Sequence, residues 1–158
     1  MQQEDNGSRE HTMANHVDVI TLAVSDLHRS LDFYRQLGFE SPGIIGSEFE
    51  GDDDQPAGAV VMFELRGGLT LALYPRSELA KDSHLADRTE PGPGEFSLGH
   101  LVSTRGEVDE ILRLAEDAGA TTTGPPHDRP WGIYSGYFQD PDGHLWEVIW
   151  NPGASSDA

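Results

Sequence analysis

Apolar positions near the start of the chain form one continuous run and then change to a helical period. Residues 17–24 (VDVITLAV) are apolar and β-branched over the length of a strand, which predicts a buried strand. From residue 27 to residue 34 apolar side chains recur three or four positions apart, Ser25 or Asp26 can cap the start, and Gly38 follows the last turn. The pattern therefore predicts a strand followed directly by an amphipathic helix.

The rest of the first half is predicted to be a loop and three further strands. A stretch rich in Gly, Pro and acidic residues follows the helix, with one short strand near residues 44–49. Residues 59–65 (AVVMFEL) and 69–74 (LTLALY) are predicted as two strands joined through Arg66-Gly67-Gly68, a hairpin signal. The first half thus has the order β-α-β-β-β.

The same order returns in the second half. Residues 96–103 are strand-like, and Thr104 with Glu107 forms the capping box of a helix that Gly119 ends. The predicted buried face of this helix consists of Val108, Ile111, Leu112 and Ala115. Three more strands are expected near residues 121–123, 133–139 and 144–150, the last two on either side of an Asp-Pro-Asp-Gly turn.

An internal repeat defines the domain, because two copies of one unit bury together apolar faces that neither buries alone. We predict a single α+β domain, residues 16–152, built from two βαβββ modules. Its parts are module one (16–76), a polar linker rich in Pro and Gly (77–95) and module two (96–152). Residues 1–15 and 153–158 are predicted to be disordered tails.

Composition limits the partners and the location. The 158-residue chain has 28 acidic and 10 basic residues and a net charge of −18, so phosphate backbones and anionic headgroups are repelled. For this acidic protein we expect no nucleic-acid partner and no membrane partner. The absence of Cys excludes disulfides and thiolate metal sites, and the polar start lacks the pattern of a secretion signal. We expect a cytoplasmic protein.

Two segments of the chain are similar to a known family. VITLAVSDLHRSLDFYRQLGF near the start and GYFQDPDGHLWEVIWNP near the end, on paired βαβββ modules, resemble the vicinal oxygen chelate superfamily. This superfamily includes glyoxalase I, extradiol dioxygenases, fosfomycin-resistance enzymes and bleomycin-binding proteins. The resemblance covers residues 17–152 and implies that the modules form a curved, half-open barrel of mixed sheet. It does not determine the activity, because the same scaffold carries several chemistries.

The resemblance also implies four positions for divalent-metal ligands, on the first and last strands of each module. Glu147, seven residues after Asp140, matches the last-strand ligand of module two. The other three positions fall on Val19, Ala72 and Ser97. Val and Ala offer no lone pair, Ser is a poor neutral ligand, and one carboxylate cannot hold a divalent metal alone. We expect no metal and no other cofactor; a divalent metal held by ligands at other positions is the alternative.

Strand alternation tests whether histidines could replace the missing ligands. His16, His100 and His144 each lie three residues from a ligand position, so alternation turns them to the opposite face. Trp146 and Trp150 have the same opposite parity and are predicted to pack against the helices.

Alternation also predicts which side chains line the concave face. If residue 138 pairs with 145 and residue 136 with 147 across the turn, Tyr134, Gly136 and Phe138 share the face of Glu147. Pro130-Trp131-Gly132 would close the mouth, and no basic side chain is expected on this face. The predicted ligand-binding residues are Thr21, Ser97, Trp131, Tyr134, Phe138 and Glu147.

This set favours a metal-independent binding protein, a homodimer whose apolar cavity holds a small, partly aromatic or cationic molecule. Trp131, Tyr134 and Phe138 would stack on the molecule, and Glu147 with the negative field would favour a cation over an anion.

Three alternatives stay open. The first is a metal-dependent glyoxalase-type lyase or a dioxygenase. The second is a metal-free lyase or isomerase in which Glu147 is the catalytic residue and abstracts a proton next to a carbonyl. In the third, Glu147 only forms a buried hydrogen bond, for instance to Tyr134 or Ser97. The sequence therefore leaves open whether the chain is an enzyme.

Overall fold

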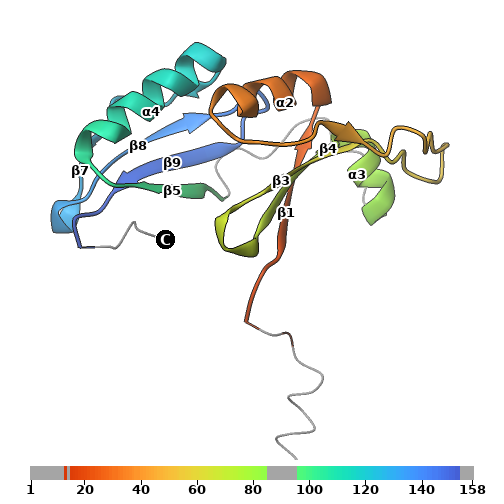
Figure 1. The fold of residues 1–158 in the computed structure, drawn as a ribbon, viewed down its shortest axis with the longest axis horizontal. Coiled ribbons are helices and arrows are strands. Elements are labelled where there is room, and N and C mark those ends of the chain that lie inside the picture. The colour runs from red at the N-terminus through yellow and green to blue at the C-terminus, as the bar shows by residue number, and fades with distance from the viewer. Residues whose placement is uncertain (1–12, 14, 85–95, 154–158) are drawn as a thin grey trace, which may run out of the picture.

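The computed structural model describes residues 13, 15–84 and 96–153, except for the side chain of Trp131 (Figure 1). Module one consists of β1 (Val19–Val24), α2 (Leu27–Gln36), β2 (Ile44–Ile45), β3 (Val60–Glu64), a 3₁₀ turn (Arg66–Gly68), β4 (Thr70–Pro75) and α3 (Arg76–Ser83). Module two consists of β5 (Leu98–Val102), α4 (Arg105–Ala118), β6 (Thr121–Thr122), β7 (His127–Asp128), a 3₁₀ turn (Pro130–Gly132), β8 (Tyr134–Gln139) and β9 (Leu145–Trp150). The two predicted tails, apart from residues 13, 15 and 153, and linker residues 85–95 lie outside the described residues.

Each module forms a separate sheet with the same topology. The strand order is β1-β4-β3-β2 in module one and β5-β9-β8-β6 in module two, where β7 also pairs with β8. In both modules the first strand runs parallel to the last, β1 to β4 and β5 to β9. Neither sheet closes on itself, so the predicted α+β fold of two βαβββ modules with half-open sheets is confirmed.

Helices α2 and α4 begin where the sequence predicts. The Asp26 side chain accepts a hydrogen bond from the backbone N–H of Arg29, and the Thr104 hydroxyl accepts one from the backbone N–H of Glu107. Both helices pack on the same side of the two sheets (Figure 1). We call the opposite side of each sheet its open face; in module one, helix α3 contacts β1 and β4.

Helix α3 packs on module one and, apart from Arg76, lies in residues 77–95, the segment predicted to be the linker. Its contacts are polar: Glu78 accepts a hydrogen bond from the backbone N–H of Ala57 at 2.8 Å, and Lys81 donates to the carbonyl oxygen of Asp52 at 2.9 Å. No residue of α3 is fully buried, so the helix has no apolar period from which it could be predicted.

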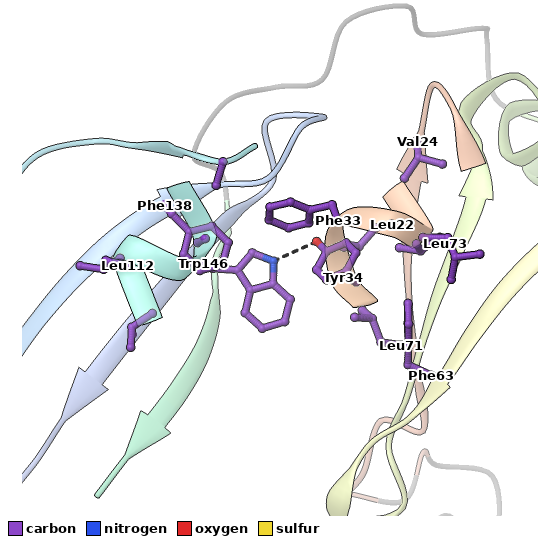
Figure 2. Close-up of a cluster of buried hydrophobic side chains, with 14 of the residues drawn as sticks. Leu22, Val24, Phe33, Tyr34, Phe63, Leu71, Leu73, Leu112, Phe138 and Trp146 are labelled. Atoms are coloured by element: carbon purple, nitrogen blue, oxygen red, sulfur yellow. Dashed lines mark hydrogen bonds between the residues drawn. The ribbon is translucent and has the colours of Figure 1, made fainter. Parts of the chain in front are cut away.

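One apolar core joins the two modules. In Figure 2, Phe33 and Tyr34 of α2 face Phe138 and Trp146 of module two, and the Trp146 indole N–H donates to the Tyr34 hydroxyl at 3.1 Å. Of the predicted helix face, Val108, Leu112 and Ala115 are buried in the same cluster and Ile111 packs against it partly buried. Trp146 lies in the core as expected.

The Asp-Pro-Asp-Gly turn between β8 and β9 reaches across to module one. Asp142 accepts hydrogen bonds from the backbone N–H of Ser25, from the Arg29 guanidinium and from the Ser30 hydroxyl, each at 2.9 Å. The predicted turn thus also connects the two halves of the molecule.

A second carboxylate of this turn is buried in the same place. Asp140 accepts a hydrogen bond from the Tyr34 hydroxyl at 2.6 Å, and the His144 ring nitrogen Nε2 is hydrogen-bonded to the carbonyl oxygen of Ala23 at 2.7 Å. We call Tyr34, Asp140, Asp142 and Trp146 the inter-module joint.

In the described part of the chain, no helix is both long enough and apolar enough to cross a membrane.

Candidate functional site

Glu147 lies on the open face of the module-two sheet. Residues directly opposite each other in neighbouring strands point to the same face, and Gly99 of β5 and Tyr137 of β8 both lie opposite Glu147 of β9. Two positions further along β9, Ile149 pairs with Leu101 and Ser135. Glu147 is therefore surrounded by glycine, tyrosine, serine and aliphatic side chains from three strands.

The register predicted between β8 and β9 was wrong by one residue. The backbone N–H of Asp140 donates to His144 O, that of Gly143 donates to Asp140 O, and Gly143 has φ of 90°. A type I turn followed by a left-handed glycine joins the strands and adds one residue to the loop. Tyr137, not Gly136, therefore lies opposite Glu147, because a shift of one residue turns every side chain of a strand to the other face.

Two predicted ligand-binding residues, Tyr134 and Phe138, and the neighbouring Gly136 consequently face the helices. Phe138 is only 2% exposed and its ring lies nearly parallel to that of Trp146, at an interplanar angle of 4°. Tyr134 donates from its hydroxyl to Asp109 of α4 at 2.8 Å, beneath the guanidinium of Arg105. Gly136 likewise faces α4. The placement of Tyr134, Gly136 and Phe138 on the concave face was therefore wrong.

The Glu147 carboxylate has two polar neighbours on the open face. The Ser135 hydroxyl donates to Oε2 at 2.9 Å, and Nη1 of Arg129 lies 3.6 Å from the same oxygen. Arg129 Nη1 also donates to the Ser135 hydroxyl at 3.4 Å. The hydrogen bond that the sequence suggested for Glu147 exists, but its partner is Ser135 rather than Tyr134 or Ser97.

The remaining predicted residues are distributed over the chain. Thr21 lies on the open face of module one, opposite Ala72, and belongs to a different sheet from Glu147. Ser97 is exposed directly before β5, and the backbone of Trp131 lies in the 3₁₀ turn Pro130–Gly132. The chain does not bring Thr21 into the same sheet as Glu147.

Sequence reasoning missed three residues of this face, Arg129, Ser135 and Tyr137. The expectation of no basic side chain near Glu147 was wrong, because Arg129 lies there. One signal was available: Pro-Asp-Gly is typical of a type I turn followed by a left-handed glycine, which would have placed Ser135 and Tyr137 correctly. No local signal exists for Arg129, which approaches Glu147 from outside the two strands.

The residues present do not fit a divalent metal. Val19 and Ala72 belong to the module-one sheet and offer no lone pair, and the atom next to Glu147 is a guanidinium nitrogen, which repels a cation. Among the described residues, no group of three or more His, Asp or Glu side chains is placed to hold a metal ion. His100 pairs with Val148, so it is turned away from the Glu147 face as predicted.

Glu147 lines neither of two hollows on the described surface. The larger, about 860 Å³, lies between the modules and is lined by the rings of Phe39, Phe63 and Trp146, by β5 and by the turn between β3 and β4. The smaller, about 430 Å³, lies between α4 and residues 122–126. The Glu147 side chain is 20% exposed on an open sheet face, so an enclosed site there needs a second surface.

Comparison with known proteins agrees with the fold. The profile of the Glyoxalase/Bleomycin resistance protein/Dioxygenase superfamily matches residues 15–148. The chain therefore belongs to this superfamily. A search of curated proteins found no match.

Several solved structures are similar over nearly the whole chain. A glyoxalase-related enzyme from Fulvimarina pelagi is 28% identical, with a TM-score of 0.74, over 92% of this chain and 96% of that one. A lactoylglutathione lyase from Agrobacterium tumefaciens is 25% identical, with a TM-score of 0.58, over 87% of this chain and 95% of that one. A fosfomycin resistance protein from Listeria monocytogenes shares the fold at 20% identity, with a TM-score of 0.63, over 89% and 97% of the two chains.

Proposed function

We propose that the protein binds a small, partly aromatic molecule on the open face around Glu147, without a metal. The observation that carries this proposal is the neighbourhood of Glu147: a carboxylate held by Ser135 and Arg129, beside Tyr137 and Leu101. A few placed polar groups among apolar and aromatic side chains are typical of small-molecule sites. Tyr137 takes the stacking role that the sequence assigned to Tyr134 and Phe138.

We propose further that a second copy of the chain covers this face, in a homodimer in the cytoplasm. Large apolar side chains are exposed on the open faces of both sheets: Val19 (51%), Met62 (41%) and Leu101 (48%). Covering them would remove apolar surface from water and would enclose Glu147. Light scattering of the full chain tests the dimer, and a monomer at micromolar concentration would contradict it.

A metal-dependent lyase is the second candidate, because one similar structure is a lactoylglutathione lyase. Elemental analysis of the purified full chain separates the two. We expect less than about one tenth of an equivalent of divalent metal, since a lone carboxylate beside a guanidinium binds metal poorly. Near one equivalent, lost in Glu147→Ala, would contradict metal-independent binding.

A metal-free lyase or isomerase with Glu147 as general base is the third candidate. Both contacts of Glu147 reach Oε2, so in the described part of the chain Oε1 is left to accept a hydrogen bond or a proton from a ligand. In this case Glu147→Gln retains ligand binding and abolishes turnover.

Binding itself is tested by a thermal-shift screen of aromatic compounds of each charge. A ligand bound only by the folded state raises the melting temperature. Hits are then mapped by NMR shifts of the backbone amides. We expect shifts at β8 and β9 around Ser135 and Glu147; hits confined to the hollow between the modules would place the site elsewhere.

A further inference from the structure

We infer that Arg129 anchors an anionic oxygen of the ligand, so that the molecule bound beside Glu147 is a small acid rather than a cation. This inference rests on the proposed function and names the chemical class of its ligand. It reverses the preference for a cation, which depended on a face without basic side chains.

Arg129 is held at the rim of the open face by its backbone. Its N–H donates to the carbonyl oxygen of Ile133 at 2.6 Å, across the 3₁₀ turn Pro130–Gly132, directly after β7. Because β7 pairs with β8, the Arg129 side chain meets Ser135 on the next strand and Glu147 on the one beyond. Three neighbouring chain segments thus bring one guanidinium, one hydroxyl and one carboxylate together.

In the described part of the chain, most N–H donors of the Arg129 guanidinium have no hydrogen-bond partner. A guanidinium has five N–H donors in a planar fork. In the described part of the chain only Nη1 of Arg129 has partners, at the long distances of 3.4 Å to Ser135 and 3.6 Å to Glu147. Arg105 is different, because it holds Asp128 with both Nη1 and Nη2, at 2.6 and 3.2 Å.

The solvent exposure of the Arg129 side chain agrees with a role in contacting a ligand. The Arg129 side chain is 37% exposed, against 20% for Glu147. The carboxylate is the more enclosed partner, so an incoming molecule meets the guanidinium edge. A carboxylate or phenolate oxygen is the acceptor that suits such an edge, through paired charge-assisted hydrogen bonds.

The Arg129–Glu147 pair lies at one of the four positions where the family resemblance implies a metal ligand. That position is Glu147, and in this chain the positive charge next to Glu147 is the guanidinium of Arg129. A guanidinium cannot exchange ligands as a metal does, but it can hold an anionic oxygen in a fixed position. The chain's net charge of −18 opposes anions at long range, although at physiological salt this repulsion is screened over roughly 8 Å.

Three probes with the same ring test the inference: benzoate (anionic), benzamide (neutral) and benzamidine (cationic). Binding to the full chain is measured by NMR titration at physiological salt. We expect benzoate to bind about tenfold more tightly than benzamide, and benzamidine most weakly. The Nε–Hε signal of Arg129, assigned by its loss in Arg129→Lys, should shift with benzoate and stay in place with benzamide.

A matched pair of variants assigns the preference to Arg129. In Arg129→Gln the affinities for benzoate and benzamide should agree within about twofold, because no charge-assisted bond remains. Arg113→Gln makes the same change of net charge at an exposed position of α4 and should keep the tenfold preference. If Arg129→Gln fails to fold, the Nε–Hε shift in the wild-type protein still decides the question.

The outcomes separate this inference from the proposed function. Binding of all three probes at Glu147 with equal affinity, or tightest binding of benzamidine, would overturn the role of Arg129 and leave small-molecule binding intact. Failure of all three probes to bind overturns the anion anchor. If the broad thermal-shift screen also finds no ligand, the proposed function fails as well.

Discussion

Gly136 shows how a single residue of β8 fits against the helix layer. A Cβ at this position would lie 2.7 Å from Leu112 Cδ1, 3.0 Å from Pro126 Cβ and 3.1 Å from Pro126 Cα. The helix α4 and the loop before β7 thus approach β8 so closely that any larger residue at position 136 would have to displace its neighbours. The same contacts confirm that this side of β8 faces the helices.

We predict that Gly136→Ala lowers the free energy of unfolding by about 1–3 kcal/mol, because the added methyl group must displace Leu112 and Pro126. Urea denaturation measures this loss. Gly124→Ala is the control, since a Cβ at Gly124 meets no atom within 4 Å, and its effect should stay within about 0.5 kcal/mol. Equal effects of the two substitutions would contradict the close packing at Gly136.

Asp140 is a buried carboxylate whose ionisation works against folding. Burial is the main cause that raises the pKa of Asp140 above its ordinary value, although hydrogen bonds from Tyr34 and from the backbone N–H of His144 oppose this shift. A carboxyl whose pKa is higher in the folded state binds protons more tightly there than in the unfolded state. Its contribution to stability is therefore most favourable at low pH and is lost as the pH rises through the folded pKa.

We predict that Asp140→Asn changes the pH dependence of stability. The asparagine does not titrate, so the free energy of unfolding of the variant relative to wild type should rise from about pH 4 to about pH 7. Denaturation of both proteins across this range measures the difference, in which the effects of the other carboxylates cancel. A difference that is constant or falls with pH would contradict the raised pKa of Asp140.

The turn between β8 and β9 is the element that decides both the site and the assembly of the modules. Its left-handed glycine turns Ser135 and Tyr137, rather than Gly136 and Phe138, toward the face of Glu147. Its two aspartates bind the start of module one, more than 100 residues away along the chain. This short motif therefore sets the register of β8 against β9 and connects the two modules. Neither effect can be predicted from the strand residues alone.

We predict that Tyr34→Phe destabilises the protein by about 1–3 kcal/mol. The hydroxyl donates to Asp140 Oδ2 and accepts from the Trp146 indole N–H, so its removal takes away the hydrogen bond that the described structure gives to each of these two buried atoms. Chemical denaturation measures the loss. Tyr137→Phe removes a hydroxyl from the open face and should change stability by less than about 0.5 kcal/mol. A Tyr34→Phe variant as stable as this control would mean that the joint contributes little to stability.

At the level of the whole molecule, the excess of acidic residues is the dominant electrostatic feature. The net charge is −18, and of the 10 basic residues Arg29, Lys81, Arg105 and Arg129 are paired with carboxylates. Mutual repulsion of the remaining acidic side chains destabilises the compact state, and salt screens it.

We predict that the melting temperature rises as NaCl increases from about 0.01 M to about 1 M, because the Debye length falls from roughly 30 to roughly 3 Å. Differential scanning calorimetry of the full chain measures this shift. Choline chloride at equal ionic strength is the control for screening and should raise the melting temperature similarly. A melting temperature that falls or stays constant in both salts would show that charge repulsion is not a main term.

The order of the elements, the helix caps and the buried helix faces could be predicted because each depends on residues within a few positions of one another. Asp26, Thr104 and the Val108–Leu112–Ala115 face are examples. The resemblance of the two end segments also led to the right superfamily, and the doubling of the βαβββ order to the right fold. Helix α3 escaped prediction because polar contacts to a distant loop hold it in place.

The composition of the candidate site was decided by tertiary structure. A single residue in the turn geometry exchanges the two faces of β8, so Phe138 enters the core and Tyr137 takes its place on the open face. Arg129 meets Glu147 only because β7 pairs beside β8. Local patterns determine which segments form strands and helices, but which side chains share a face depends on pairing between segments, and that pairing is set by packing of the whole chain.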